Sequence, residues 1–278
     1  MFGEHAVVYA KPGIAMAIKP RVFVTVRDTK RAQKAKSPYI DGCFEAMGVV
    51  GSVYINSQIP SSSGLGSSAA VTVATLCAIN DEFRLNKTRE DIANMAFEIE
   101  KTVQKGRASP TDTTVSSYGG IVLISGGSRR RLPPQNMHLV IGDSLVSHST
   151  ARMVEQVAEL KAKHPEIVEP VMNAIEGVTL SGIHQLSNPR ELGRYMNMNH
   201  NLLEVLGVSN NQLARMVLAA RSAGAFGAKI TGAGGGGSMV ALCPKQLKHR
   251  VASAIEACEA RAIVTGIDTE GARKEKNV

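Results

Sequence analysis

Hydrophobic and polar residues follow regular patterns over most of the 278-residue chain. Residues 22–26 and 52–56 alternate between the two kinds, as half-buried strands do. Residues 67–83 are apolar almost all round after a start rich in Ser and Gly, which predicts a buried helix. A capping box at Thr88 predicts a second helix that runs to about Val103. The first half therefore contains a strand, a glycine-rich loop and a helix in succession.

The rest of the chain also alternates between strand-like and helix-like patterns. A buried strand is expected over residues 119–124, and the Gly-, Arg- and Pro-rich stretch 126–134 is the expected domain boundary. Residues 151–223 carry several amphipathic helices, and residues 228–264 return to strands around one helix. This alternation predicts α+β layers rather than a helical bundle. The two expected domains are residues 1–132 and 133–278.

The composition is that of a folded protein, because 44% of the residues are hydrophobic and 20% are charged. No apolar run approaches the roughly 18 residues of a membrane span, and the first residues lack the layout of a signal peptide. We therefore expect a soluble, cytoplasmic protein with no membrane partner. The cysteines have no metal-binding or redox spacing. Free thiols are expected at Cys43, Cys77, Cys243 and Cys258.

The formal net charge of +8 indicates an anionic partner, either a nucleic acid or a phosphate ligand. A single-strand binder uses aromatic side chains to stack on bases, but aromatic residues make up 4% of this chain and Trp is absent. The densest basic segments, 19–36 and 129–131, are interpreted as solvated strand edges or loops. A phosphate ligand is therefore favoured, and no nucleic-acid partner is expected.

The loop from Pro60 to Ala70 is the strongest candidate for a phosphate site. Its glycines let the backbone approach an anion, and the N-terminus of the following helix offers free N–H groups and a positive dipole end. Ser67 and Ser68 are expected in the cap and first turn, where a hydroxyl can reach a phosphate or Mg²⁺. A plain serine-capped helix is the alternative, but five serines and two glycines in the eight residues 61–68 exceed what a cap requires.

Two familiar nucleotide motifs do not explain this loop. Residues 64–69 and 232–237 both match the dinucleotide-binding string, but the first has no second strand ending in an acidic residue and the second precedes a strand. The phosphate loop with a Gly-Lys-Ser/Thr ending is absent, as are the His-Arg-Asp and Asp-Phe-Gly motifs of protein kinases. A different class of nucleotide loop is predicted.

Two carboxylates near this loop suggest phosphoryl transfer. Helical spacing places Glu100 at the border of an apolar stripe, from which its side chain can point into a cleft. Asp112 lies in a predicted Ser-Pro-Thr-Asp-Thr turn, where composition alone favours a local cap of backbone N–H groups. Together the two residues supply what the reaction needs, one to hold Mg²⁺ and one to orient or deprotonate a hydroxyl.

A second glycine loop covers residues 232–237. Six residues, five of them Gly, cost more folding entropy than a simple turn between strands requires. Backbone N–H groups in this loop could donate hydrogen bonds to phosphate oxygens or to a substrate oxygen. The loop is therefore expected to shape a ligand site.

These segments resemble the GHMP small-molecule kinases. The two glycine loops carry the resemblance together with the N-terminal run Gly3–Tyr9 (GEHAVVY). Within the family, this run, residues 109–113 and the pattern Asn197-x-Asn199-x-x-Leu202-Leu203-x-x-Leu206-Gly207-Val208 are similar to mevalonate kinases of archaeal type. The resemblance implies an N-terminal α/β domain like the second domain of the fifth small-subunit ribosomal protein, followed by a ferredoxin-like α+β domain.

The implied activity is ATP-dependent phosphorylation of the 5-hydroxyl of (R)-mevalonate, an early step of isoprenoid biosynthesis. Kinases of the same family that act on phosphomevalonate, homoserine or a sugar are the nearest alternatives. A non-catalytic RNA-binding protein is the alternative from another class, and it predicts nucleic-acid affinity with a steep salt dependence. That alternative leaves Asp112 and the second glycine loop unexplained.

The resemblance also implies the residues that bind ATP and Mg²⁺. The first glycine loop would wrap the phosphates, and Ser68 and Glu100 would bind Mg²⁺. The implied ATP-binding residues are Pro60, Ser61, Ser62, Ser63, Gly64, Leu65, Gly66, Ser67, Ser68, Ala69 and Ala70.

For the acceptor, the resemblance implies that Asp112 is the catalytic base. A homodimer is the family expectation. The implied mevalonate-binding residues are Glu4, His5, Thr231, Gly232, Ala233 and Gly234.

The chain departs from the family pattern at two places. Relatives carry a strand with a Pro-Gly-Lys segment before the residues that match 2–5, and its lysine assists the catalytic aspartate. Loss of a charge-stabilising group beside a phosphoryl centre costs factors of about 10² or more, so we expect this chain to be less active than one extended through such a strand. One extra residue within 103–108 is expected to bulge the loop between Glu100 and Asp112.

Overall fold

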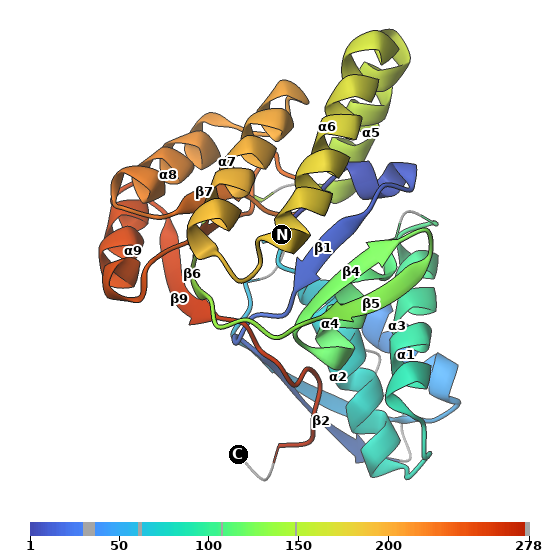
Figure 1. Cartoon of the computed structure of the whole chain (residues 1–278). Helices are drawn as coiled ribbons and strands as arrows, with labels where there is room; N and C mark the ends of the chain where they lie inside the picture. The colour runs from blue at the N-terminus through green and yellow to red at the C-terminus, as the bar shows by residue number, and fades with distance from the viewer. Residues whose placement is uncertain (30–36, 61–62, 107, 148, 276–278) are drawn as a thin grey trace.

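The computed structural model describes residues 1–29, 37–60, 63–106, 108–147 and 149–275. Two predicted ATP-loop residues, Ser61 and Ser62, lie outside the described residues. The chain forms two halves that lie side by side, with most of the blue-to-green part on one side and most of the yellow-to-red part on the other (Figure 1). Each half has an antiparallel sheet with helices packed on it.

The first half contains a three-stranded sheet of order β1-β4-β5 and a separate antiparallel pair, β2 and β3. Its helices pack on one another and on these strands, with α2 against β2 and against α1, α3 and α4. The short 3₁₀ helix η1 (Ala6–Tyr9) precedes the sheet. The other elements are β1 (Gly13–Met16), β2 (Val22–Asp28), α1 (Pro38–Met47), β3 (Gly51–Ser57), α2 (Ser67–Glu82), α3 (Arg89–Val103), α4 (Pro110–Tyr118), β4 (Ile121–Ser125) and β5 (Ser128–Leu132).

Local signals predicted several of these elements correctly. The alternating segments form β2 and β3, which pair from Val22 opposite Ser57 to Asp28 opposite Gly51. The Ala-rich segment forms α2. The capping box of α3 is present, since Thr88 accepts a hydrogen bond from the Asp91 N–H and the Asp91 carboxylate accepts one from the Thr88 N–H.

Two details in this half are informative. The stretch 126–134, the expected domain boundary, contains β5, which forms an antiparallel hairpin with β4. The three arginines 129–131, interpreted as a solvated strand edge or loop, lie on this edge strand. Asp112 lies in the first turn of α4 rather than in an isolated turn, because Ser109 caps this helix and Pro110 begins it.

The second half is a ferredoxin-like domain. Its strands follow the chain order β-α-β-β-α-β and have the spatial order β7-β8-β6-β9, which confirms the expected α+β fold. Among the described helices, none combines the length and the apolar character that a membrane span requires. The elements are β6 (His138–Asp143), α5 (Thr150–Lys163), α6 (Pro165–His184), α7 (Pro189–Val205), α8 (Asn211–Ser222), β7 (Gly227–Ile230), β8 (Ser238–Leu242), η2 (Lys245–Leu247), α9 (Lys248–Glu256) and β9 (Arg261–Gly266).

A shared hydrophobic cluster joins the two halves. Phe2, Ile14 and Ile121 from the first half pack with Leu192 and Met196 of α7 in the second half. All five side chains are at most 3% exposed. Burial at this level contributes roughly 1.5–3 kcal/mol for each large apolar side chain. The halves are thus held in a fixed relation across the region between them.

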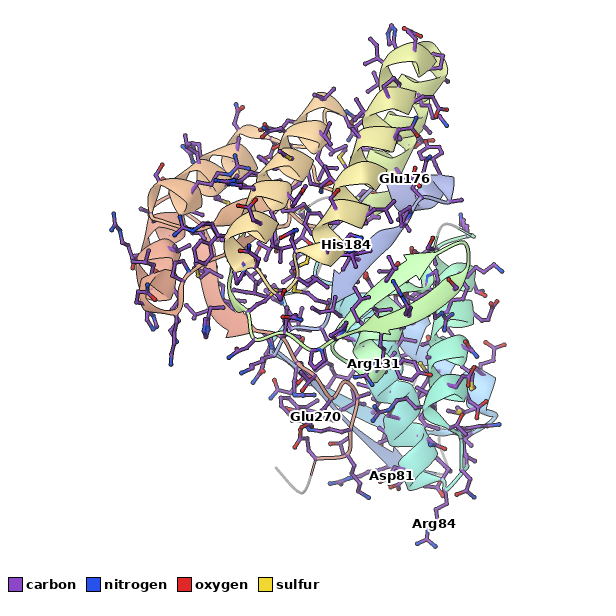
Figure 2. The ribbon with its side chains drawn as sticks, in the orientation of Figure 1. Asp81, Arg84, Arg131, Glu176, His184 and Glu270 are labelled. Carbon is purple, nitrogen blue, oxygen red and sulfur yellow. The ribbon has the colours of Figure 1, made fainter. Side chains whose placement is uncertain are left out.

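The segment after β9 returns to the first half, and we call residues 267–274 the C-terminal strap. Three arginines of the first half hold its backbone: Arg21 donates to the carbonyl of Gly271, Arg89 to that of Glu270, and Arg131 to that of Thr269. Figure 2 shows Arg131 and Glu270 on this part of the molecule. The strap therefore adds a second connection between the two halves.

Candidate active site

The first glycine loop leads directly into the N-terminus of α2. Gly64 and Gly66 have φ values of 72° and 70°, which glycine adopts without strain. Gly66 is the N-cap residue and has no side chain with which to cap the helix. Ser67 and Ser68 are therefore both in the first turn, and the expectation that a serine occupies the cap is wrong. The first N–H groups of a 16-residue helix remain available to an anion.

The other described residues of the loop support this arrangement. The Ser63 side chain is 2% exposed, and its hydroxyl donates a 2.8 Å hydrogen bond to the carbonyl of Pro60. Ala69 is fully buried. Leu65 packs at the edge of the cluster between the two halves. Pro60, Ser63, Leu65 and Ala69 thus shape the loop and anchor its ends, and Ala70 lies one residue further along α2.

Ser68 and Glu100 lie in direct contact. The Ser68 hydroxyl donates a 2.8 Å hydrogen bond to Glu100 Oε1, which joins the start of α2 to the last turns of α3. Glu100 is 3% exposed, so its side chain points inward as the helical spacing predicts. Burial raises the pKa of Glu100 to about 7; the Ser68 hydroxyl opposes this shift and the charge of Asp112 adds to it. A buried carboxylate beside a hydroxyl is a pair of hard oxygen donors.

Asp112 is held against the N-cap of α2. A Cβ added to Gly66 would lie 3.3 Å from both Cγ and Oδ2 of Asp112. The cap role that composition favoured belongs to Ser109, whose hydroxyl accepts a hydrogen bond from the Thr111 N–H. One side of Asp112 faces solvent, but the protein packed around its carboxyl group raises the pKa of this residue above its usual value.

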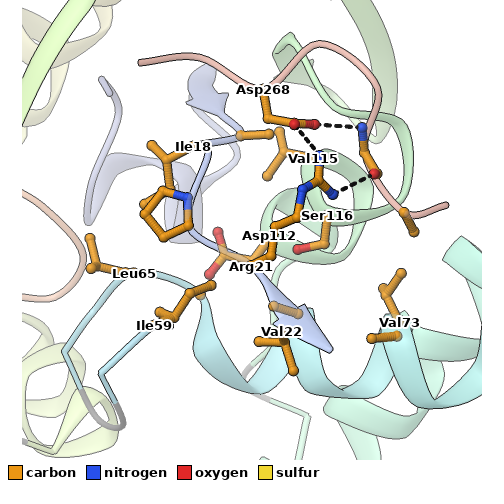
Figure 3. Close-up of a pocket in the computed structure, with 17 residues that line it drawn as sticks. Ile18, Arg21, Val22, Ile59, Leu65, Val73, Asp112, Val115, Ser116 and Asp268 are labelled. Carbon is orange, nitrogen blue, oxygen red and sulfur yellow. Dashed lines mark hydrogen bonds and ion pairs between the residues drawn. The ribbon is translucent and has the colours of Figure 1, made fainter. Parts of the chain in front are cut away.

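Asp112 also points into a cavity of about 110 Å³ (Figure 3). Apolar side chains such as Ile18, Ile59 and Leu65 form much of its wall. Its polar wall carries Arg21, which forms an ion pair with Asp268 of the C-terminal strap. The carboxylate of Asp112 is therefore accessible to a small molecule.

The second glycine loop contacts the first. A Cβ added to Gly232 would lie 3.0 Å from the carbonyl oxygen of Gly64, so the two loops approach to a distance that only glycine permits. The Thr231 N–H donates to the carbonyl of Ser238 at 3.0 Å, and the Gly235 N–H donates to that of Val208 at 2.8 Å. Ala233 and Gly234 are buried between these anchors. The two loops, far apart in sequence, form one surface.

The N-terminal residues Glu4 and His5 lie against the second loop. His5 is 6% exposed, and its Nε2 lies 2.9 Å from the carbonyl oxygen of Ala233. Burial lowers the pKa of His5 below its usual value, which favours the neutral ring. Both carboxylate oxygens of Glu4 bind protein groups, one on Lys229 and the other on Asn199.

Sequence reasoning gave no role to Lys229 or Asn199. Lys229 is fully buried in β7, the strand that leads into the second loop. The sequence signal that could have indicated its role is a lysine within a strand next to a glycine loop. Helix α3 ends at Val103, and both Lys105 and Gly106 have positive φ in the loop that leads toward Asp112, where one extra residue is expected from the family pattern.

The structure therefore brings all the described candidate residues into one region. Ser68, Glu100 and Asp112 surround the N-terminus of α2, and the second loop with Glu4 and His5 closes the other side. In the described part of the chain, no group of three or more His, Cys, Asp or Glu side chains could hold a metal ion alone. A cation here would need oxygen ligands from a bound molecule as well, as in Mg²⁺ sites completed by phosphates.

Comparisons with known proteins identify this arrangement. Residues 32–120 match the family model described as GHMP kinases N terminal domain, and residues 179–260 match GHMP kinases C terminal. Together with the site, these matches define a small-molecule kinase of the GHMP class. The chain is 40% identical to the mevalonate kinase of Methanothermobacter thermautotrophicus, over 88% of this chain and 87% of the relative. It is 37% identical to that of Thermococcus sibiricus, over 99% of this chain and 95% of the relative.

The chain belongs to the mevalonate kinase family. Among solved structures, it is similar to the mevalonate kinase of Methanococcus jannaschii, with 26% identity and a TM-score of 0.83 over 96% of this chain and 95% of the other. The L. major mevalonate kinase, solved in complex with R-mevalonate, has the same fold, with a TM-score of 0.85 at 24% identity over 98% of this chain and 94% of the other. The expected kinase fold is thereby confirmed.

Proposed function

We propose that this chain transfers the γ-phosphoryl group of ATP to the 5-hydroxyl of (R)-mevalonate and releases ADP and 5-phosphomevalonate. The observation that carries the proposal is the position of Asp112, packed on the N-cap of α2 beside the Ser68–Glu100 pair. Family membership supports mevalonate as the acceptor. The reaction is an early step of isoprenoid biosynthesis.

The first glycine loop is the proposed site of the ATP phosphates. The free N–H groups at the start of α2 and the positive end of its dipole favour the phosphate charge. Ser67 lies in the first turn, where its hydroxyl can donate to a phosphate oxygen. The second loop would supply N–H groups from the opposite side, since Gly232 packs on Gly64.

The residues present fit a bound Mg²⁺. Ser68 Oγ and the Glu100 carboxylate are hard oxygen donors that lie together at the helix start, and the phosphates would complete the coordination. When bound, the ion neutralises charge on the phosphates. Ionised Glu100 would hold it there.

Asp112 is the proposed general base. Its carboxylate accepts the proton of the mevalonate 5-hydroxyl as the oxygen of that hydroxyl attacks the γ-phosphorus and the bond to ADP breaks. Because the pKa of Asp112 is raised above its usual value, the carboxylate binds that proton more readily. The rest of mevalonate would lie against His5 and Thr231 to Gly234, on the face opposite the first loop.

We further propose a division into domains 1–132 and 133–278, a homodimer and a cytoplasmic location. The two family matches, over residues 32–120 and 179–260, fall on either side of the proposed boundary. The dimer rests on the family resemblance, and sedimentation equilibrium tests it.

The proposed activity is tested by coupled ADP release. The purified chain is assayed with Mg²⁺-ATP and, separately, mevalonate, phosphomevalonate, homoserine and galactose. Turnover of mevalonate alone is expected, and Asp112→Ala should abolish it. Turnover of another acceptor with none of mevalonate would contradict the proposal.

A further inference from the structure

We propose that Lys229 is a positioning residue for the acceptor site, acting with Asn199 to fix Glu4 and thereby His5. The inference rests on the proposed function, because His5 is one of the groups assigned to the acceptor. Lys229 itself is not one of the residues proposed to contact mevalonate or ATP. It acts through Glu4, which it holds in one orientation.

The surroundings of Lys229 leave it few other roles. Its side chain is fully buried in β7, where its neighbours Ala228 and Ile230 belong to the cluster formed with α8 and α9, and Lys229 lies on the alternate face of the strand. Its ammonium group donates to Glu4 Oε1 and, at 2.6 Å, to the carbonyl of Ile230. A buried charge requires a partner of opposite sign. Glu4 is that partner, and its own side chain is 10% exposed.

Helix α7 fixes the same pair from a third direction. Asn199 is fully buried, and its Nδ2 donates to Glu4 Oε2 at 3.1 Å. Asn197, two residues earlier in α7, accepts a 3.0 Å hydrogen bond from the Ala228 N–H of β7. These two residues form the Asn-x-Asn pattern of the sequence, and neither of them has a role in the proposed phosphoryl transfer. The pattern thus ties β7 and Glu4 to one helix.

The contact between α7 and β7 is close enough to make this scaffold rigid. A Cβ added to Gly193 of α7 would lie 2.4 Å from the carbonyl carbon of Phe226, and one added to Gly227 would lie 2.0 Å from the carbonyl oxygen of Gly193. Neither position admits a side chain. Lys229 and Asn199 therefore have little freedom to move apart.

The scaffold transmits its geometry to the acceptor site through two adjacent residues. Glu4 is fixed by Lys229, and His5, the next residue, contacts Ala233, four residues after Lys229. His5 has a φ of 62°, a conformation that costs a non-glycine residue energy and persists only when its neighbours impose it. Burial opposes ionisation of Glu4, but Lys229 and the ammonium group of Met1 together overcome that effect and lower the pKa of Glu4 to about 2.

The test is the double variant Lys229→Met with Glu4→Gln. It removes both charges of the Lys229–Glu4 pair at nearly constant volume. The buried ammonium group of Met1, 3.9 Å from Glu4 Oε1, keeps its 2.7 Å hydrogen bond to the carbonyl of Ile14, so the variant separates positioning from stability. In a folded double variant we expect the KM for mevalonate to rise at least tenfold, while the KM for ATP stays within twofold. An unchanged KM for mevalonate in the folded double variant would overturn the proposal.

Two further variants keep the test decisive. Asn199→Ala leaves the Lys229–Glu4 pair in place. If the double variant does not fold, this variant decides: the proposal requires that it raise the KM for mevalonate at least threefold. Lys11→Met removes an ion pair with Glu176 at 2.7 Å from the same N-terminal segment, outside the site, and should leave both KM values unchanged. Turnover by the unmodified chain reports separately on the proposed function, and if another acceptor is turned over, its KM replaces that of mevalonate.

Discussion

The hydroxyl of Ser68 and the carboxylate of Glu100 form a 2.8 Å hydrogen bond between the first turn of one helix and the last turns of another. This contact places a buried acid where the phosphates of a nucleotide would end. Burial raises the pKa of Glu100 from 4.5 to about 7, so this carboxyl group changes its charge near neutral pH. Two measurable consequences follow from that shift, one for stability and one for cation binding.

The stability of the chain should depend on pH through Glu100. A carboxyl group whose pKa is raised on folding stabilises the native state fully below its unfolded pKa and loses that contribution as pH rises through its folded pKa. Between pH 4.5 and 7 the loss amounts to roughly 3 kcal/mol. Glu100→Gln has no such titration, so the Tm of the variant minus that of the parent should increase across this interval. Thermal unfolding without Mg²⁺ measures it.

Addition of Mg²⁺-ATP gives the matching control. Because a cation compensates the ionised carboxylate, the ligand should raise the Tm of the parent at pH 8 more than that of Glu100→Gln. Tm curves of parent and variant that run parallel from pH 4.5 to 8 would contradict the assignment of a raised pKa to Glu100.

Asp112→Asn should reduce kcat by a factor of about 10² to 10⁴ and leave ATP binding nearly unchanged, because the amide keeps the shape of the side chain but cannot accept the proton. Steady-state kinetics and calorimetric titration with ATP check the two parts. Asp81→Asn, at an exposed residue that pairs with Lys274, is the matched control and should retain full activity. A kcat for Asp112→Asn within threefold of the parent would exclude Asp112 as the base.

A comparison of alanine variants at Gly66 and Gly48 distinguishes the effect of backbone strain from the effect of displacing Asp112. Their φ values are 70° and 64°, so an alanine at either position costs about 1–2 kcal/mol of strain. A Cβ at Gly48 meets nothing within 4 Å, whereas one at Gly66 meets the Asp112 carboxyl at 3.3 Å. Gly66→Ala and Gly48→Ala should therefore lower Tm similarly, but only Gly66→Ala should reduce kcat, by a factor of roughly 10².

Equal kcat values for the two glycine variants would mean that Asp112 can move without loss of activity. That result would argue against a base fixed by its contact with the N-cap of α2. A large additional loss of Tm in Gly66→Ala alone would instead show that the neighbouring backbone cannot absorb the added carbon.

Much of this site could be predicted from the sequence, because its parts have local signals. The helix after the first loop and the capping box at Thr88 depend on residues close together in the chain. The helix that carries Asp112 also has a local signal, a Ser followed by Pro at its start, but the composition of residues 109–113 predicted a turn instead. The Lys229–Glu4 pair could not be predicted, because 225 residues separate its members and only folding brings β7 beside the N-terminal segment. For β5, the run of arginines predicted a solvated strand edge or loop, but it could not predict the pairing with β4.

The C-terminal strap should stabilise the chain through Arg21. Its guanidinium donates to Asp268 and, at 3.2 Å, to the carbonyl of Gly271, and the side chains of Arg21 and Asp268 are 20% and 13% exposed. Hydrogen bonds to charged groups at this depth contribute about 1.5–3 kcal/mol each, so Arg21→Ala should lower the free energy of unfolding by about 2 kcal/mol. Urea denaturation measures this free energy. Arg130→Ala, at an exposed position of β5, is the control; like most surface substitutions, it should change the free energy of unfolding by less than about 0.5 kcal/mol.

The pair can be tested as a pair by a double-mutant cycle. If the strap is held by the contact of Arg21 with Asp268, Arg21→Ala and Asp268→Ala together should cost less than the sum of the single changes, by about 0.5–3 kcal/mol. Additive free energies would mean that Arg21 and Asp268 stabilise the strap independently, and the strap would then owe its position to its backbone hydrogen bonds with residues 17, 117 and 120.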